Sequence, residues 1–358
     1  MKRTRNRSTG NSCGYHLLNW CERDGPIVIA TLKRLASALC LSPLPRYNHL
    51  TFEAIRLDTL FALAIFAFGL AFGSFLNVCI YRMPRDKSVV FPGSACPGCG
   101  HRIRWYDNVP VLSWVVLRGR CRDCHTGISP RYAFVELLVA FLFLLCYLRF
   151  GLTLETLKYC IFSFLLTGLI FTDAETKLLP DELTLSGLVI GLVLSWFVPV
   201  NNVLSDILPR LGNSNWRLDS LTGSVLGALT GAGFIYGAGL GYKLARGIEG
   251  MGLGDVKLMA MVGAFLGLKL TLFTIFGASL LGATFGLSSI PAVWVKRTRR
   301  RMVRGHESRG VASRRAWQSA KNVYRYYAMP FGVFLGAMAL VAVFFGGAIF
   351  RWYLGRYA

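Results

Sequence analysis

Charged residues are scarce in this chain, and acidic residues are the scarcest. Only 16% of the 358 residues are charged, with 18 Asp and Glu against 40 Lys and Arg. A soluble protein usually carries about a quarter charged residues, whereas 54% of this chain is hydrophobic and its mean hydropathy is +0.47. The composition argues against an ordinary soluble protein of this length. It predicts a membrane domain with extramembrane insertions.

The surplus of basic residues does not indicate a nucleic-acid partner. A formal net charge of +22 is of the kind that nucleic-acid-binding proteins show. Here the basic residues lie between long apolar runs, where positive loops set the topology of a membrane protein and contact anionic lipid. We therefore expect membrane lipid as a partner, and no nucleic acid.

Eight apolar runs have about the length that a helix needs to cross a bilayer. They span residues 59–81, 132–150, 156–172, 182–200, 219–242, 256–270, 272–295 and 330–350. The sequence thus predicts an all-α membrane protein with about eight transmembrane helices. In the fifth run Gly223, Gly227 and Gly231 recur every four residues, so one helix face is bare and a neighbouring helix can pack closely.

The chain divides into five parts by composition. Residues 1–57 form a basic extension, 58–155 an N-terminal domain with the first span and a polar loop, 156–295 the central membrane domain, 296–329 a basic loop, and 330–358 the last helix and tail. The central domain also contains polar residues 201–218 between two apolar runs, which we interpret as an insertion.

The positive-inside rule orients the predicted bundle. The basic segments 82–131 and 296–325 are separated by six apolar runs, so both can lie in the cytoplasm. An eight-helix bundle then puts both termini outside, which conflicts with the basic residues 1–57. Either residues 26–45 make a further crossing or a helix on the membrane surface, or the extension is dispensable and not part of the core.

Four of the ten cysteines form two CxxC pairs in the polar loop between the first two spans. They are Cys96, Cys99, Cys121 and Cys124, with 21 residues between the pairs. This spacing is close to that of zinc ribbons, and four thiolates bind Zn²⁺ tetrahedrally. Cytoplasmic placement disfavours disulfides, and a metal would stabilise a segment that has few aliphatic residues. We predict a structural zinc ion; a redox role and free thiols are the alternatives.

Acidic residues in spanning segments are costly, and they mark functional sites by default. Asp173 ends the third apolar run and Asp255 begins the sixth, so the predicted topology brings both to the cytoplasmic face. Two adjacent carboxylates cannot both stay ionised. The ionised one can take a proton from water while the other donates to a peptide carbonyl, as in aspartyl proteases. Gly252 and Gly254 let a substrate approach, although a loop with a capping Asp would contain the same residues.

Longer motifs around these residues resemble one family, the bacterial type IV prepilin peptidases. GMGLGDVKL at 250–258 and LLPD at 178–181, just after Asp173, resemble its catalytic segments. The N-terminal domain agrees independently, in the segments GSFLNVCIYRMPR, CPGC, NVPVLSW, RGRCRDC and ISPRYAFVE. The resemblance covers about residues 58–350.

The resemblance implies a multi-pass enzyme of the bacterial inner membrane. Such a peptidase removes the short basic leader from prepilins and pseudopilins, the substrates of type IV pilus and type II secretion systems. By the same resemblance Asp173 and Asp255 are the catalytic pair at the cytoplasmic face. Gly252, Gly254 and Lys257 then form the active-site loop.

Members of this family often also methylate the new N-terminal amine, with S-adenosylmethionine as the methyl donor. The resemblance places this activity in the N-terminal domain. Our candidate cofactor-binding residues are Gly73, Asn77, Arg82 and Glu136. Glu136 has an alternative role, which is to pair with an arginine of the polar loop.

Two other classes of protein remain open. An ion- or proton-coupled transporter also contains buried Asp pairs, but these lie near the bilayer midplane on broken helices. A zinc-bearing membrane scaffold without enzymatic activity would tolerate replacement of both aspartates.

Overall fold

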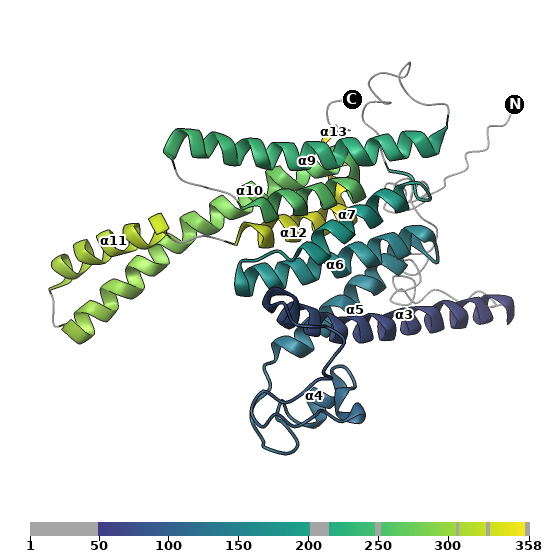
Figure 1. The fold of residues 1–358 in the computed structure, drawn as a ribbon, viewed down its shortest axis with the longest axis horizontal. Coiled ribbons are helices and arrows are strands. Elements are labelled where there is room, and N and C mark those ends of the chain that lie inside the picture. Colours follow the sequence, from purple (N-terminus) through teal and green to yellow (C-terminus); the bar gives the residue numbers. More distant parts are fainter. Residues whose placement is uncertain (1–48, 201–214, 248–251, 306–307, 327–329, 355–358) are drawn as a thin grey trace, which may run out of the picture.

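The computed structural model describes residues 49–200, 215–247, 252–305, 308–326 and 330–354. The regular elements in these ranges are helices, and they pack side by side into a bundle with α9 along one edge and α3 along the opposite edge (Figure 1). Most of the basic extension and most of the insertion at 201–218 lie outside the described residues. The predictions made for them are therefore not addressed by the structure.

The helices follow the predicted apolar runs closely. In chain order they are α3 (His49–Arg82), α5 (Arg131–Phe150), α6 (Leu154–Thr176), α7 (Asp181–Ser195), α9 (Trp216–Arg246), α10 (Leu253–Gly305), α11 (Arg309–Tyr326), α12 (Phe331–Val341) and α13 (Gly347–Leu354). The polar segment between α3 and α5 contains the short elements η1 (Met83–Arg85), η2 (Trp105–Asn108) and α4 (Leu112–Val116). A π-helical turn, η3 (Ala342–Gly346), joins α12 to α13.

Six helices of the described part are long and apolar enough to cross a membrane. They confirm an all-α, multi-pass membrane protein, but they do not confirm the predicted count of eight spans. One reason is α7, whose 15 residues fall short of the roughly 20 that a crossing needs. The other is α10, which is counted as one span although its backbone is non-helical at Gly267, with φ 72° and ψ 176°.

The chain reverses direction at Gly267. A Cβ atom added to Gly231 on α9 would lie 3.0 Å from Thr271 Cγ2 and would also overlap the carbonyl oxygen of Met259. Residues on either side of Gly267 are therefore neighbours, and α10 consists of two antiparallel segments. The predicted break at residue 271 is thus slightly late. Glycine suits the true turn because it adopts a positive φ without strain.

The glycine face of α9 packs as predicted. A Cβ atom on Gly227 would overlap the carbonyl oxygen of Gly263, and one on Gly263 would overlap that of Gly227. Only hydrogen fits at these positions, so α9 and α10 approach backbone to backbone. The Ser224 hydroxyl donates to the carbonyl of Ala264 at 2.6 Å, which satisfies a polar group inside this contact.

The core lies between α6, α7, α10 and α12. Phe162 on α6 stacks on Phe265 on α10, with their ring centroids 4.5 Å apart. Leu166, Met261 and Leu335 are fully buried members of the same cluster. This packing fixes the ends of α6 and α10 relative to each other, which matters because each end carries an aspartate.

The basic segment predicted as a loop at 296–329 is largely helical. Residues 296–305 continue α10, and α11 packs back against them at the end farthest from the bundle (Figure 1). Trp294 Nε1 donates to the Ser313 carbonyl at 3.1 Å, and the Trp294 and Trp317 rings meet edge to face. The segment is therefore a helical hairpin.

Candidate active site and metal centre

Asp173 and Asp255 face the same small space at one end of the bundle. Asp173 lies in the last turn of α6 with 5% of its surface exposed, and Asp255 lies half-buried in the first turn of α10. A Cβ atom added to Gly332 would lie 2.9 Å from Asp173 Oδ2 and 3.4 Å from Asp255 Oδ1. Both carboxylate oxygens therefore lie within 3.4 Å of one point.

Local sequence explains the position of Asp173. The N-cap of α6 is Thr153, whose hydroxyl accepts a hydrogen bond from the backbone N–H of Thr156. The C-cap is Lys177, which is left-handed (φ 56°) and donates its N–H to the carbonyl of Asp173 at 3.0 Å. This C-cap closes the last helical turn on Asp173 itself. Pro180 then precedes α7.

The start of α12 completes the site, and the sequence analysis missed it. Val333 N–H donates to Asp173 Oδ2 at 3.0 Å, and Gly332 beside it leaves the space between the carboxylates open. From the sequence, residues 330–350 are predicted only as a span. The available signal was Pro330 and Gly332 at the point where an apolar run follows a basic segment.

The loop before Asp255 docks on the α6–α7 turn. A Cβ atom on Gly254 would lie 3.1 Å from Leu179 Cβ, so a larger residue there would separate α10 from this turn. Lys257 Nζ donates to both carboxylate oxygens of Asp181, at 2.6 and 2.8 Å. Asp181 was not among the predicted site residues. Gly252 is exposed and contacts little, so packing gives no reason for a glycine there.

Three of the four candidate methyl-transfer residues lie together where α3 meets α5. A Cβ atom on Gly73 would lie 2.6 Å from the Cα of Glu136. Asn77 Nδ2 donates to the Tyr132 carbonyl at 3.0 Å. Both Asn77 and Glu136 are buried, and the Asn77 Oδ1 atom has no hydrogen-bond partner within the described part of the chain.

Arg82 and Glu136 hold the polar segment onto the bundle. Arg82 donates to three backbone carbonyls of residues 88–93, the shortest bond being 2.7 Å to Pro92. Glu136 Oε2 accepts the backbone N–H of Val111 at 2.7 Å. The proposed pairing of Glu136 with an arginine is therefore not what the described residues show.

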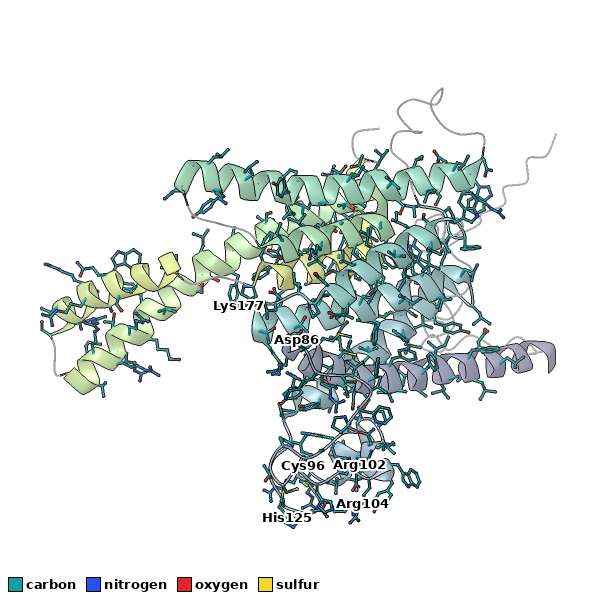
Figure 2. All side chains as sticks on the ribbon, in the orientation of Figure 1. Asp86, Cys96, Arg102, Arg104, His125 and Lys177 are labelled. Atoms are coloured by element: carbon teal, nitrogen blue, oxygen red, sulfur yellow. The ribbon has the colours of Figure 1, made fainter. Side chains whose placement is uncertain are left out.

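An ion pair links the start of α5, where the polar segment ends, to the end of the bundle that carries the two aspartates. Arg131, the first residue of α5, pairs with Glu175 in the last turn of α6. Glu175 follows Asp173 by two residues, so the cysteine-containing segment and the two aspartates lie at the same end. Figure 2 shows the same relation, with Asp86 and Lys177 near that end of the bundle and Cys96 in the small segment that extends from it.

The two CxxC pairs form two similar loops. In each loop the first cysteine donates its N–H to a carbonyl five residues later, from Cys96 to His101 and from Cys121 to Thr126, both at 2.9 Å. The four Sγ atoms lie within 4.8 Å of one another, and those of Cys96 and Cys124 are 3.7 Å apart. Four thiolates about 2.3 Å from one Zn²⁺ have S···S separations of about 3.8 Å. The donor set therefore fits one tetrahedral metal ion.

Further contacts stiffen this segment. Arg122 donates to both carboxylate oxygens of Asp107, with the shortest bond at 2.6 Å. These hydrogen bonds hold the pKa of Asp107 below its usual value. Trp114 Nε1 donates to the Ile128 carbonyl at 3.1 Å, so the segment folds around several polar contacts in addition to the cysteines.

Two family models match ranges of the chain that contain these residues. Residues 67–150 match the Bacterial Peptidase A24 N-terminal domain, and residues 160–287 match the Type IV leader peptidase family. The cysteines lie in the first match and both aspartates in the second, while Gly332 lies outside both. No solved structure matches the chain.

Curated relatives cover most of the chain. A prepilin leader peptidase/N-methyltransferase of Myxococcus xanthus (strain DK1622) is 41% identical over 64% of this chain and 63% of its own length. Proteins with the same description from Aeromonas salmonicida (strain A449) and Pseudomonas putida are 32% and 34% identical, over 81% and 79% of this chain and 92% and 90% of their own lengths. On these matches, the chain belongs to the type IV leader peptidase family.

Proposed function

We propose that this protein is a membrane aspartyl endopeptidase that removes the leader peptide from type IV prepilins and pseudopilins. The observation that carries the proposal is the pair Asp173 and Asp255, whose carboxylates face one space at Gly332 within segments that match the family. The described relatives are prepilin leader peptidases/N-methyltransferases. The carboxylates lie at the end of the bundle, which favours a peptidase over an ion-coupled transporter with a midplane site.

The chemistry follows from two carboxylates that share one proton. The ionised carboxylate takes a proton from water, and the water oxygen attacks the scissile carbonyl carbon. The protonated carboxylate donates to the carbonyl oxygen, which gives a neutral tetrahedral intermediate. Proton transfer to the amide nitrogen then allows the C–N bond to break. Gly252 leaves the approach to Asp255 open, Gly254 lets α10 pack against Leu179, and Lys257 links the start of α10 to α7 through Asp181.

We place the protein in the bacterial inner membrane with this end of the bundle in the cytoplasm. The support is the distribution of charge. The polar segment and the α10–α11 hairpin are rich in Arg and Lys, and both lie on the side of the aspartates. Positive residues near span ends remain on the cytoplasmic side.

We propose a second activity, methylation of the new N-terminal amine. S-adenosylmethionine would supply the methyl group, and Gly73, Asn77, Arg82 and Glu136 are the candidate residues that hold it. The support is that Asn77 on α3 and Glu136 on α5 are buried polar residues where these two helices meet. In addition, Asn77 Oδ1 has no hydrogen-bond partner in the described part of the chain. A ligand donor would satisfy this oxygen.

We propose that the metal held by Cys96, Cys99, Cys121 and Cys124 is a structural Zn²⁺. Four protein thiolates fill a tetrahedral shell and leave no position for a reacting water. When bound, the ion would supply folding free energy to a segment with little apolar core.

One experiment tests both activities. Membranes that contain the protein are incubated with a prepilin that has a basic leader and a Gly–Phe junction, with and without S-adenosylmethionine, and the product mass is measured. We expect loss of the leader in both reactions and a product heavier by one CH₂ group when S-adenosylmethionine is present. An uncut prepilin would refute the peptidase, and full cleavage without the mass shift would refute methylation.

A further inference from the structure

The two aspartates have different surroundings. Asp173 is buried, and its Oδ2 atom accepts the backbone N–H of Val333 at 3.0 Å. Asp255 is half-buried, and no described residue donates a hydrogen bond to its carboxylate. The pair is therefore asymmetric although the two residues are chemically identical.

The asymmetry arises from the way α12 begins. Val333 is the third residue of α12, and the first N–H groups of a helix have no partner within the helix. A Ser, Thr, Asp or Asn at the N-cap usually accepts one of them, but the N-cap here is Pro330, which has no side-chain acceptor. Asp173 from α6 takes this role. A carboxylate at a helix N-terminus is favoured by the charge-assisted hydrogen bond and by the helix dipole.

We propose that α12 assigns the roles within the catalytic pair, so that Asp173 is the ionised carboxylate that activates water and Asp255 holds the proton. This inference rests on the proposed peptidase function. Two carboxylates this close carry one charge between them. The charge resides where a hydrogen-bond donor and a helix N-terminus face it, which is at Asp173.

The assignment fixes the route of each proton. The nucleophilic water gives its proton to Asp173, and its oxygen bonds to the carbonyl carbon. Asp255 gives its proton to the carbonyl oxygen, which forms a gem-diol. Asp173 then returns its proton to the amide nitrogen as the C–N bond breaks, and one hydroxyl of the diol returns a proton to Asp255. The products are a carboxylic acid and an amine, and the pair regains its starting state.

Chemical labelling tests the assignment without using cleavage as the readout. A nitrophenyl glycidyl ether is opened by an ionised carboxylate, which attacks the epoxide carbon and leaves an ester while the alkoxide takes a proton from water. We expect the ester on Asp173 in at least about tenfold excess over Asp255, from the usual strength of a hydrogen bond to a charged group. Peptide mass spectrometry of the full-length protein measures the ratio.

Solvent exposure works against this result, because Asp255 is the more exposed of the two. An ester found mainly on Asp255, or equally on both, would overturn the proposal. Such a result with normal prepilin cleavage would leave the peptidase function intact. Conversely, selective labelling of Asp173 in a protein that does not cleave prepilin would support the assignment of the charge to Asp173 and refute the peptidase function.

A variant pair isolates the N–H of Val333. Val333→Pro removes the donor at a first-turn position, where proline is tolerated, while Val333→Ala keeps it. We expect the preference for Asp173 to fall several-fold in Val333→Pro and to persist in Val333→Ala. Equal preference in both variants would overturn the role of the Val333 N–H. If Val333→Pro does not accumulate, the labelling ratio of the wild-type protein still decides the assignment.

Discussion

Replacement of Gly332 by alanine tests whether the carboxylates of Asp173 and Asp255 face the same space. The added Cβ atom would lie 2.9 Å from Asp173 Oδ2, 3.2 Å from Asp173 Cγ and 3.4 Å from Asp255 Oδ1. Ordinary contacts are about 3.5–4.0 Å, so at least one carboxylate has to move or α12 has to shift. Overpacking of this kind costs about 1–3 kcal/mol of stability.

The effect of Gly332→Ala on activity should exceed its effect on stability. The methyl group would lie against both carboxylates, in the space where the proposed mechanism places the water and the scissile carbonyl. A displacement of about 1 Å at a reacting centre can cost about a hundredfold in rate. We therefore expect leader removal to slow by about tenfold to a hundredfold, measured as the initial rate in membranes with matched protein levels.

Gly347→Ala is the matched control. Gly347 begins α13 in the same part of the chain, and a Cβ atom there would meet nothing within 4 Å. Alanine should raise helix stability by about 0.5–1 kcal/mol and leave cleavage unchanged. If Gly332→Ala cleaved prepilin at the wild-type rate while present at a normal level, the two carboxylates would not face each other at Gly332, and the described site would be wrong.

Three further predictions concern the surroundings of the site. Purified protein should hold about one zinc per chain. A variant with all four cysteines changed to serine should lose the zinc, and its methylation activity should fall more than its cleavage activity. Stoichiometric zinc in that variant would refute the site. Asp181→Asn should slow cleavage about two- to fivefold, because the Asp181–Lys257 ion pair is partly exposed and such pairs are worth about 0.2–1 kcal/mol. The control Glu182→Gln should leave cleavage unchanged, and reversing both charges of the Asp181–Lys257 pair should restore activity. Hydrogen bonds from Arg122 lower the pKa of Asp107, so the contribution of Asp107 to stability is present above about pH 4 and is lost as pH falls through its folded-state pKa. The thermal unfolding temperatures of Asp107→Asn and of the wild type should therefore differ at neutral pH and converge in acid. A difference in unfolding temperature that does not change with pH would contradict this.

Because acidic residues are rare in this chain, the sequence was enough to single out Asp173 and Asp255 as a candidate pair, and the structure brings their carboxylates to one space. Asp173 and Asp255 stand out at the ends of apolar runs, and the chain has only 18 acidic residues. The cysteine cluster was predictable from spacing, because two CxxC loops have few ways to arrange four thiolates. Both predictions rest on residues whose chemistry is visible without a fold.

The parts that sequence analysis missed depend on backbone geometry. Gly332 and Val333 contribute a space and a backbone N–H group, and the signal in the sequence was limited to Pro330 and Gly332 at the start of an apolar run. The reversal at Gly267 lies inside continuous apolar sequence, where hydropathy does not change. Glu136 was predicted from its charge, yet its carboxylate binds the backbone of Val111, a partner that only the fold of the polar segment could bring near.

The most direct test of the account is the rate of prepilin cleavage by Asp173→Asn and by Asp255→Asn. Each substitution is nearly isosteric and removes one of the two groups that share a proton, so each variant should accumulate normally in the membrane and cut no detectable prepilin. If either variant, present at the wild-type level, processed prepilin at a rate near that of the wild type, the assignment of this pair as the catalytic centre would be contradicted.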